Sequence, residues 1–196
     1  CGDFGGVWDG SKGEERNLDW LEHLPFTTLF VSGNHENFDR LAKYPVDHWN
    51  GGTIQRIRPH VIHLMRGQVF DLQGHTFFTM GGASSHDIED GILSPYAPDF
   101  KEQYLALRNM GARFRVNHQS WWKQELPCPA EYEEAMRNLE RVHFNVDYII
   151  THCAPSSIED TMSRGTFAHD HLTDFLEEIR TQTQFHYWLF GHYHDN

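Results

Sequence analysis

The sequence predicts a single α/β domain. Short apolar runs alternate with segments of helical periodicity in both halves of the chain, and three of the apolar runs end in Asn or His. Such alternation is typical of a domain built on a largely buried sheet that helices cover. With 196 residues, 39% of them hydrophobic, the chain can bury one ordinary core. We therefore expect one domain that spans residues 1–196.

The first half of the chain begins with a short helix. Leu18, Leu21 and Leu24 recur at helical spacing, and Pro25 ends the pattern. The apolar run 27–31 indicates a buried strand, and residues 36–44 indicate a second helix. Three more strands are expected next, at residues 61–64, 68–72 and 75–80, with a hairpin turn at Gln73-Gly74.

The second half opens with about 40 irregular residues after Gly81-Gly82, a length that is typical of a functional or partly helical segment. A helix is then expected from Pro129, because apolar residues recur every three or four positions up to Val142. A strand at 147–150 and a helix around 172–179 follow. A last buried strand is expected at 187–190.

The composition limits the partners. The chain has 16 Lys and Arg against 28 Asp and Glu, a net charge of −12, which argues against long nucleic acid and leaves a small phosphorylated substrate or a phosphoprotein as the expected partner. No apolar run approaches the ~20 residues of a membrane span. Three cysteines without metal or disulfide spacing favour the cytoplasm. The chain starts at Cys1 and stops after a histidine-rich segment, so we expect the natural protein to continue past both ends.

The ends of the strands carry the chemistry. Polar side chains follow three of the expected strands, at the edge where open α/β sheets bind ligands. The opening Gly2-Asp3 segment carries a further one and is read as the end of a fourth strand. They form a mixed set of oxygen and nitrogen donors: Asp3, Asn34, His35, His152, His192 and His194. Such a set suits Mn, Fe or Zn better than Ca or Cu(I).

Four motifs in this order resemble the calcineurin-like metallophosphoesterases: Gly2-Asp3, Gly33-Asn34-His35-Glu36, His152 and Gly191-His192-Tyr193-His194. The resemblance implies a two-sheet β-sandwich flanked by helices, in αββα layers. It also implies hydrolysis of a phosphate ester by water that two divalent metal ions activate. Manganese is the expected metal, with Fe, Zn, Ni or Mg as alternatives.

The resemblance also implies a role for each residue. Asp3 would bridge the two ions, Asn34, His152 and His192 would complete one site, and His194 would ligate the other ion. His35 would protonate the leaving oxygen as the catalytic acid, and Glu36 would hold His35 in position. Two features depart from the family pattern: the chain has no Asp-x-His motif, and Gly5-Gly6 stands where many relatives have Asp-Arg.

Three functions remain open. A phosphomonoesterase is favoured, and a phosphodiesterase or nuclease of the same fold is the close alternative. The third is a non-catalytic scaffold with this fold, for which the absent Asp-x-His motif is the support. The segment Ser84-Ser85-His86-Asp87 is expected on the rim of the metal site, and Ser84 and Arg113 are expected to contact the substrate phosphate.

Overall fold

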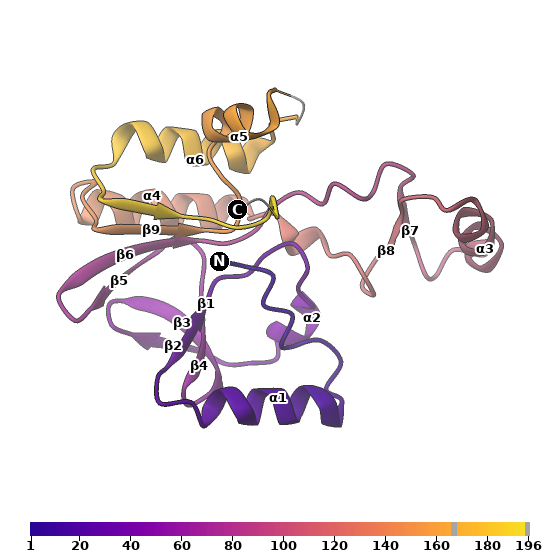
Figure 1. Ribbon diagram of the computed structural model, residues 1–196, viewed down its shortest axis with the longest axis horizontal. Coiled ribbons are helices and arrows are strands. Elements are labelled where there is room, and N and C mark those ends of the chain that lie inside the picture. The colour runs from indigo at the N-terminus through magenta and orange to yellow at the C-terminus, as the bar shows by residue number, and fades with distance from the viewer. Residues whose placement is uncertain (166–167, 195–196) are drawn as a thin grey trace.

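The computed structural model describes residues 1–165 and 168–194 and contains two four-stranded sheets (Figure 1). The first sheet has the strand order β1-β4-β3-β2. Its only parallel pair joins β1 (Thr28–Phe30) to β4 (Val61–Leu64), and β3 (Gly52–Arg58) and β2 (Val46–Trp49) continue it in antiparallel fashion. The β1 strand, which leads to Asn34, therefore lies at an edge of this sheet.

The second sheet has the order β10-β9-β6-β5. The strands β6 (His75–Met80), β9 (Tyr148–Thr151) and β10 (Tyr187–Leu189) run parallel, and β5 (Gln68–Leu72) forms a hairpin with β6. Because β9 and β10 are parallel neighbours, His152 and His192, which follow them, emerge at the same edge of the sheet.

The two sheets face each other across an apolar layer. This layer combines Ile54, Ile62 and Leu64 of the first sheet with Phe70 of the second, and Phe77 and Ile150 pack against it. All six side chains lie on strands, as expected when two sheets stack face to face.

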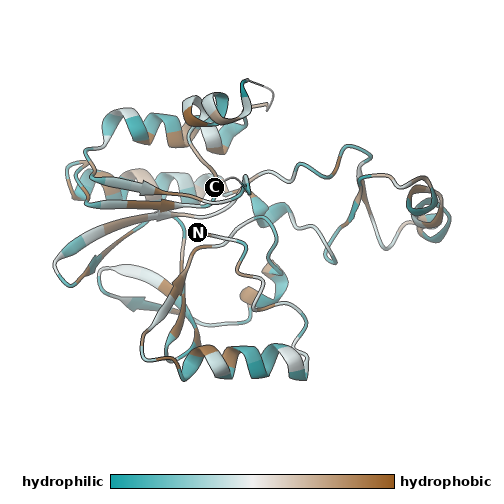
Figure 2. Ribbon diagram, in the orientation of Figure 1, coloured by the Kyte–Doolittle hydropathy of each residue, from teal (hydrophilic) through white to brown (hydrophobic). Residues whose placement is uncertain are grey.

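Helices cover the outer faces of both sheets (Figure 1). On the first sheet, α1 (Lys12–Glu22) packs on β3 and β4, and the short α2 (Phe38–Leu41) joins the same apolar cluster. On the second sheet, α4 (Pro129–Arg141) and α6 (His171–Gln182) bury one apolar face each, and α5 (Ser156–Ser163) packs against α6. Figure 2 shows these helices as mixtures of hydrophilic and hydrophobic turns, which fits helices with one face on the core.

The expected irregular stretch contains a projection. The paired short strands β7 (Ile92–Leu93) and β8 (Arg115–Val116) and the helix α3 (Phe100–Met110) extend away from the two sheets (Figure 1). No residue of α3 is buried. The chain then returns to the body of the molecule through the 3-10 turn η1 (Lys123–Glu125).

The expected α/β class is confirmed, and three details of the sequence reading are wrong. The last strand is not buried: Tyr187 is 61% and Leu189 is 46% exposed, because β10 is an edge strand. The expected helix over residues 36–44 shortens to Phe38–Leu41. The hairpin of β2 and β3 was not expected. None of the helices in the described part of the chain is long and apolar enough to cross a membrane.

Candidate metal centre

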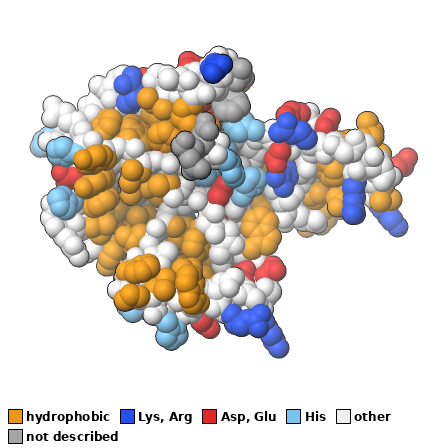
Figure 3. Space-filling view, in the orientation of Figure 1, with side chains coloured by type: hydrophobic (Ala, Val, Ile, Leu, Met, Phe, Trp, Pro, Cys, Tyr) orange, Lys and Arg blue, Asp and Glu red, His pale blue; other side chains and the backbone are white. Residues whose placement is uncertain are grey.

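Three of the expected ligands meet where the strands end. The Nε2 atom of His152 lies 3.1 Å from Oδ1 of Asn34 and 3.3 Å from Oδ1 of Asp3. The His192 ring stands beside that of His152, with 5.0 Å between the ring centroids. Figure 3 shows histidine side chains gathered near the middle of one face of the molecule.

Glycines allow these segments to approach so closely. A Cβ atom on Gly2 would lie 2.1 Å from Nδ1 of His152, and one on Gly33 would lie 2.0 Å from Oδ1 of Asp3. A Cβ atom on Gly191 would lie 2.7 Å from the carbonyl oxygen of Cys1. Each glycine next to an expected ligand therefore makes room for another segment of the site.

Two buried groups fix the orientation of the Asn34 amide. The Ser85 hydroxyl donates to the Glu125 carboxylate at 2.6 Å, so its oxygen is left to accept from Nδ2 of Asn34 at 3.2 Å. The backbone N–H of Ser85 also donates to Glu125. This chain of hydrogen bonds turns the Asn34 oxygen toward His152.

A backbone carbonyl fixes the His152 ring in the same way. Nδ1 lies 2.8 Å from the carbonyl oxygen of Cys1, which can only accept, so Nδ1 carries the proton. In the neutral ring, Nε2 then offers a lone pair to two oxygens, of Asn34 and Asp3, that are also acceptors. Three acceptors that face one another repel, and either a second proton on His152 or a cation between them removes the repulsion.

Backbone strain marks the same segments. Asp3, His192 and His194 have positive φ angles of 48°, 71° and 54°, which non-glycine residues adopt at an energetic cost. Residues in such conformations concentrate at functional sites, where the surrounding structure compensates for the strain.

Electrostatics keep Asp3 charged and His192 neutral. Burial raises the pKa of Asp3, but the hydrogen bond and charge of His152, together with the backbone N–H of His35, lower it to about 2 overall. Burial, with the neighbouring charges of His152, His86 and His35, lowers the pKa of His192 to about 3. At neutral pH, Asp3 is therefore an anion, and the His192 ring keeps a lone pair for a ligand.

Glu36 ties the loops together. Its buried carboxylate accepts hydrogen bonds from the backbone N–H groups of Phe4, Gly5 and Gly33, at 2.7, 3.2 and 3.4 Å. Burial raises the pKa of Glu36 to about 7 against these hydrogen bonds. Within the described residues, its hydrogen bonds go to this backbone rather than to the His35 ring. Glu36 thus holds the loop of Asp3 against the loop of Asn34.

His35 lies at the edge of the cluster. Its backbone N–H donates to Oδ1 of Asp3 at 2.9 Å, and the side chain is partly exposed. Asp87 lies near His35. Burial raises the pKa of Asp87, but its partner Arg115 and, to a smaller extent, the charge of His35 lower it below its usual value. The carboxylate of Asp87 is paired with the Arg115 guanidinium through Nε at 3.0 Å and through a second short contact.

Three expected site residues lie apart from the cluster. His194 is exposed, and within residues 1–165 and 168–194 it has no hydrogen bond or ion pair to the other ligands. Ser84 donates to Asp170, the residue that caps α6. Arg113 forms an ion pair with Glu89 at 2.9 Å and donates to the backbone oxygen of His86.

The donor set fits a divalent ion of mixed oxygen and nitrogen preference. A carboxylate oxygen, an amide oxygen and an imidazole nitrogen converge, and a second imidazole stands beside them. In the described part of the chain, no group of three or more His, Cys, Asp or Glu side chains is arranged to hold a metal. That grouping does not count Asn, and here the amide oxygen of Asn34 is the third donor atom beside Asp3 and His152.

Sequence reasoning missed the groups behind the ligands. Ser85 and Glu125 orient Asn34, and the Cys1 carbonyl orients His152. His86 was expected only as part of the rim, and its ring lies 4.9 Å from that of His192. Glu125 itself ends the polar triplet Lys123-Gln124-Glu125, so the sequence gives no signal that its side chain is buried.

Comparisons of the chain with protein-family models, with curated proteins and with solved structures gave no match.

Proposed function

We propose that the protein is a metal-dependent phosphoesterase that acts on a small phosphorylated substrate or a phosphoprotein, with a phosphomonoester as the favoured substrate. The observation that carries the proposal is the convergence of three acceptor atoms, from Asp3, Asn34 and His152, that only a cation or an added proton can reconcile. The order of the four sequence motifs, which resembles that of the metallophosphoesterases, supports the same reading.

Each ligand residue has a defined part. Asp3 supplies a fixed negative charge, Asn34 supplies an amide oxygen, and His152 and His192 supply imidazole nitrogens. Two divalent ions held there would provide Lewis-acid activation of the phosphate and of water. Manganese is our first choice, because the donors are oxygen and nitrogen without sulfur.

His35 is proposed as the general acid. Its backbone is fixed to Asp3, while its ring is partly exposed beside the cluster, where it can give a proton to the oxygen of the leaving group. Asp87 lies near that ring, since the charge of His35 contributes to lowering the Asp87 pKa. Arg115 is proposed ahead of Arg113 to meet a substrate phosphate, because its partner Asp87 lies near His35, whereas Arg113 pairs with Glu89.

The decisive experiment measures metal stoichiometry and turnover together. The purified protein is dialysed with Mn²⁺, its metal content is determined by elemental analysis, and hydrolysis of an aryl phosphate monoester is compared with that of the bis-aryl diester. We expect bound metal and faster monoester turnover. His35→Ala should lower turnover by ~10²-fold or more and leave the metal content unchanged.

Either of two results would contradict the proposal. A protein that binds no metal would support the scaffold alternative, in which the fold lacks catalysis. Faster turnover of the diester at matched concentration would favour a phosphodiesterase. Asp3→Ala serves as the second variant, because loss of the Asp3 carboxylate should remove the bound metal.

A further inference from the structure

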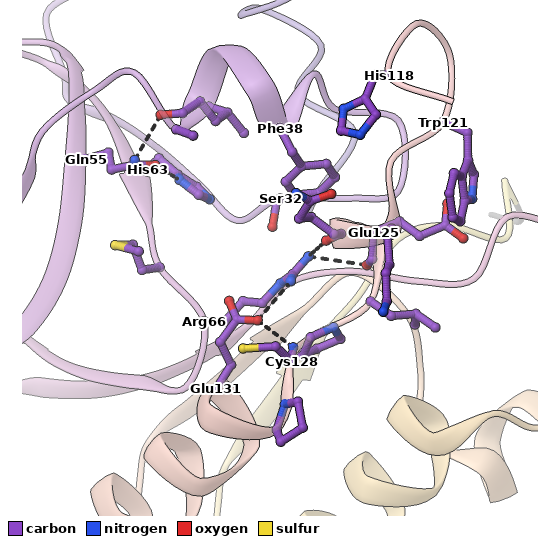
Figure 4. Close-up of a pocket in the computed structure, with 18 residues that line it drawn as sticks. Ser32, Phe38, Gln55, His63, Arg66, His118, Trp121, Glu125, Cys128 and Glu131 are labelled. Carbon is purple, nitrogen blue, oxygen red and sulfur yellow. Dashed lines mark hydrogen bonds and ion pairs between the residues drawn. The ribbon is translucent and has the colours of Figure 1, made fainter. Parts of the chain in front are cut away.

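A cavity of about 970 Å³, whose lining is shown in Figure 4, shares part of its wall with the surroundings of the candidate metal centre. Ser32, which directly precedes Gly33-Asn34, and Glu125, which orients Asn34, form part of its wall. Its size is that of a site for a small organic molecule. Much of the remaining wall is apolar: Phe38, Leu41, Met65, Trp121, Leu126 and Pro127.

The wall contains a buried hydrogen-bond acceptor without a partner. His63 is 7% exposed, and Nδ1 lies 2.9 Å from Oε1 of Gln55. Because Nε2 of Gln55 donates to the backbone oxygens of Leu41 and Tyr44, its Oε1 must accept, and Nδ1 of His63 carries the proton. Nε2 of His63 is left with a lone pair and no hydrogen-bond partner among the described residues. Figure 4 shows the ring directed away from Gln55 into the cavity.

The wall also contains a buried donor without a partner. Arg66 is 7% exposed, and its terminal nitrogens bind Glu131 at 3.3 Å and the backbone oxygens of Gln124 and Glu125 at 2.7 and 3.2 Å. Its Nε–H has no hydrogen-bond partner in residues 1–165 and 168–194. The guanidinium also lies over the Phe38 ring, 5.4 Å from the centroid.

The charges that line the cavity are balanced. Glu131 neutralises Arg66, and the two other charged residues on the wall, Lys123 and Glu125, are of opposite sign. Burial, together with the charge of Arg66, lowers the pKa of His63 to about 3, so the ring is neutral at pH 7. An anion would therefore find no excess of positive charge, whereas an uncharged polar ligand would find the acceptor of His63 and the donors of Arg66 and Trp121.

We propose that this cavity binds an uncharged heteroaromatic ligand that carries a hydrogen-bond donor and an acceptor on one ring system, as a nucleobase does. The donor would meet Nε2 of His63, and the acceptor would meet Nε–H of Arg66. The aromatic side chains of Phe38 and Trp121, which line the cavity, would contact the ring. Buried polar atoms without a partner are rare in native proteins, and this ligand would satisfy both.

The test uses adenosine and uridine as neutral probes and inorganic phosphate as the anionic probe. Binding is followed by ligand-observed NMR in the presence of EDTA, so that the result does not depend on the proposed metal centre. We expect at least one nucleoside to bind and phosphate not to displace it.

Two variants locate the binding. Ala42 lines the cavity, is exposed and has an ordinary helical backbone, so Ala42→Trp should fold and obstruct the cavity, abolishing detectable binding. His63→Phe keeps an aromatic ring stacked on Phe30 but removes the acceptor, and should weaken binding about two- to tenfold. His75→Gln, at an exposed position on β6, is the matched control and should bind as the wild type does.

The proposal is overturned if neither nucleoside binds the wild-type protein. It is also overturned if Ala42→Trp binds as tightly as the wild type, which would place the ligand elsewhere, or if phosphate alone binds and competes. Loss of metal binding or of esterase activity in other experiments would leave these outcomes unaffected.

Discussion

The Asn34 side chain can offer its oxygen to a metal only while its NH₂ group is held elsewhere. The Ser85 hydroxyl holds it, and Glu125 holds Ser85 in turn. Groups behind a metal ligand commonly affect metal affinity strongly, because they fix the direction of the donor atom. The candidate centre therefore depends on residues that touch no metal.

We predict that Ser85→Ala weakens Mn²⁺ binding about 10- to 100-fold. The buried site readily accommodates the smaller residue, but Asn34 loses the contact that orients its amide. Isothermal titration calorimetry with Mn²⁺ measures the change. The neighbouring Ser84→Ala is the matched control, because Ser84 donates to Asp170 instead, and its affinity should stay that of the wild type. Equal losses in the two variants would refute the orienting role of Ser85.

The buried His63 makes the stability of the folded protein depend on pH. Its pKa is lowered from 6.5 to about 3 by burial and by Arg66, so below pH 6.5 the unfolded chain takes up a proton that the folded protein refuses. This residue therefore costs stability as pH falls from 6.5 toward 3, on the order of a few kcal/mol in total. Urea denaturation between pH 7 and 4 should show a shallower pH dependence for His63→Phe than for the wild type. His48→Phe, at an exposed position on β2, should keep the wild-type dependence.

Among the elements, those with strong local signals were predicted well and those decided by distant contacts were not. The leucine spacing of α1 and the apolar stripe of α4 correspond to observed helices. The edge position of β10 could not be seen in the sequence, because Tyr187-Trp188-Leu189 has the composition of a buried strand and only the order of the sheet exposes it. The β2-β3 hairpin had a local signal that was overlooked. Asn50-Gly51 forms its turn, with φ angles of 48° and 92°.

The turn between β5 and β6 affects the stability of that hairpin. Gln73 and Gly74 join β5 to β6 with φ angles of 57° and 82°, so both residues occupy the left-handed region. Gln tolerates this region poorly, whereas Asn visits it readily. Gln73→Asn should raise the free energy of unfolding by up to about 1 kcal/mol, and Gly74→Ala should lower it by roughly the same amount. Thermal or urea denaturation measures both, and a destabilised Gln73→Asn would argue against this turn geometry.

For the whole molecule, the sequence predicted which chain segments meet but not how they are held. The four motifs follow strands, or stand where a strand end is expected, so their residues could be expected at one edge of the sheets, as Asp3, Asn34 and His152 are. Glu125 orients Asn34 through Ser85, and the Cys1 carbonyl orients His152; each lies far in sequence from the donor that it orients. The spacing of His192 and His194 likewise did not predict that His194 is exposed.

The net charge of −12 predicts weak binding to duplex DNA. A duplex binds proteins chiefly through its phosphates, and an acidic surface repels them. A labelled short DNA duplex should bind more weakly than about 10⁻⁴ M at near-physiological salt in an anisotropy titration, with or without Mn²⁺, because two divalent ions leave the protein strongly negative. The same titration at low salt is the control, since weak electrostatic attraction would appear there first. Micromolar binding that disappears with salt would reveal a basic surface able to overcome the net charge, and would move a nuclease ahead of the phosphomonoesterase among the candidate functions.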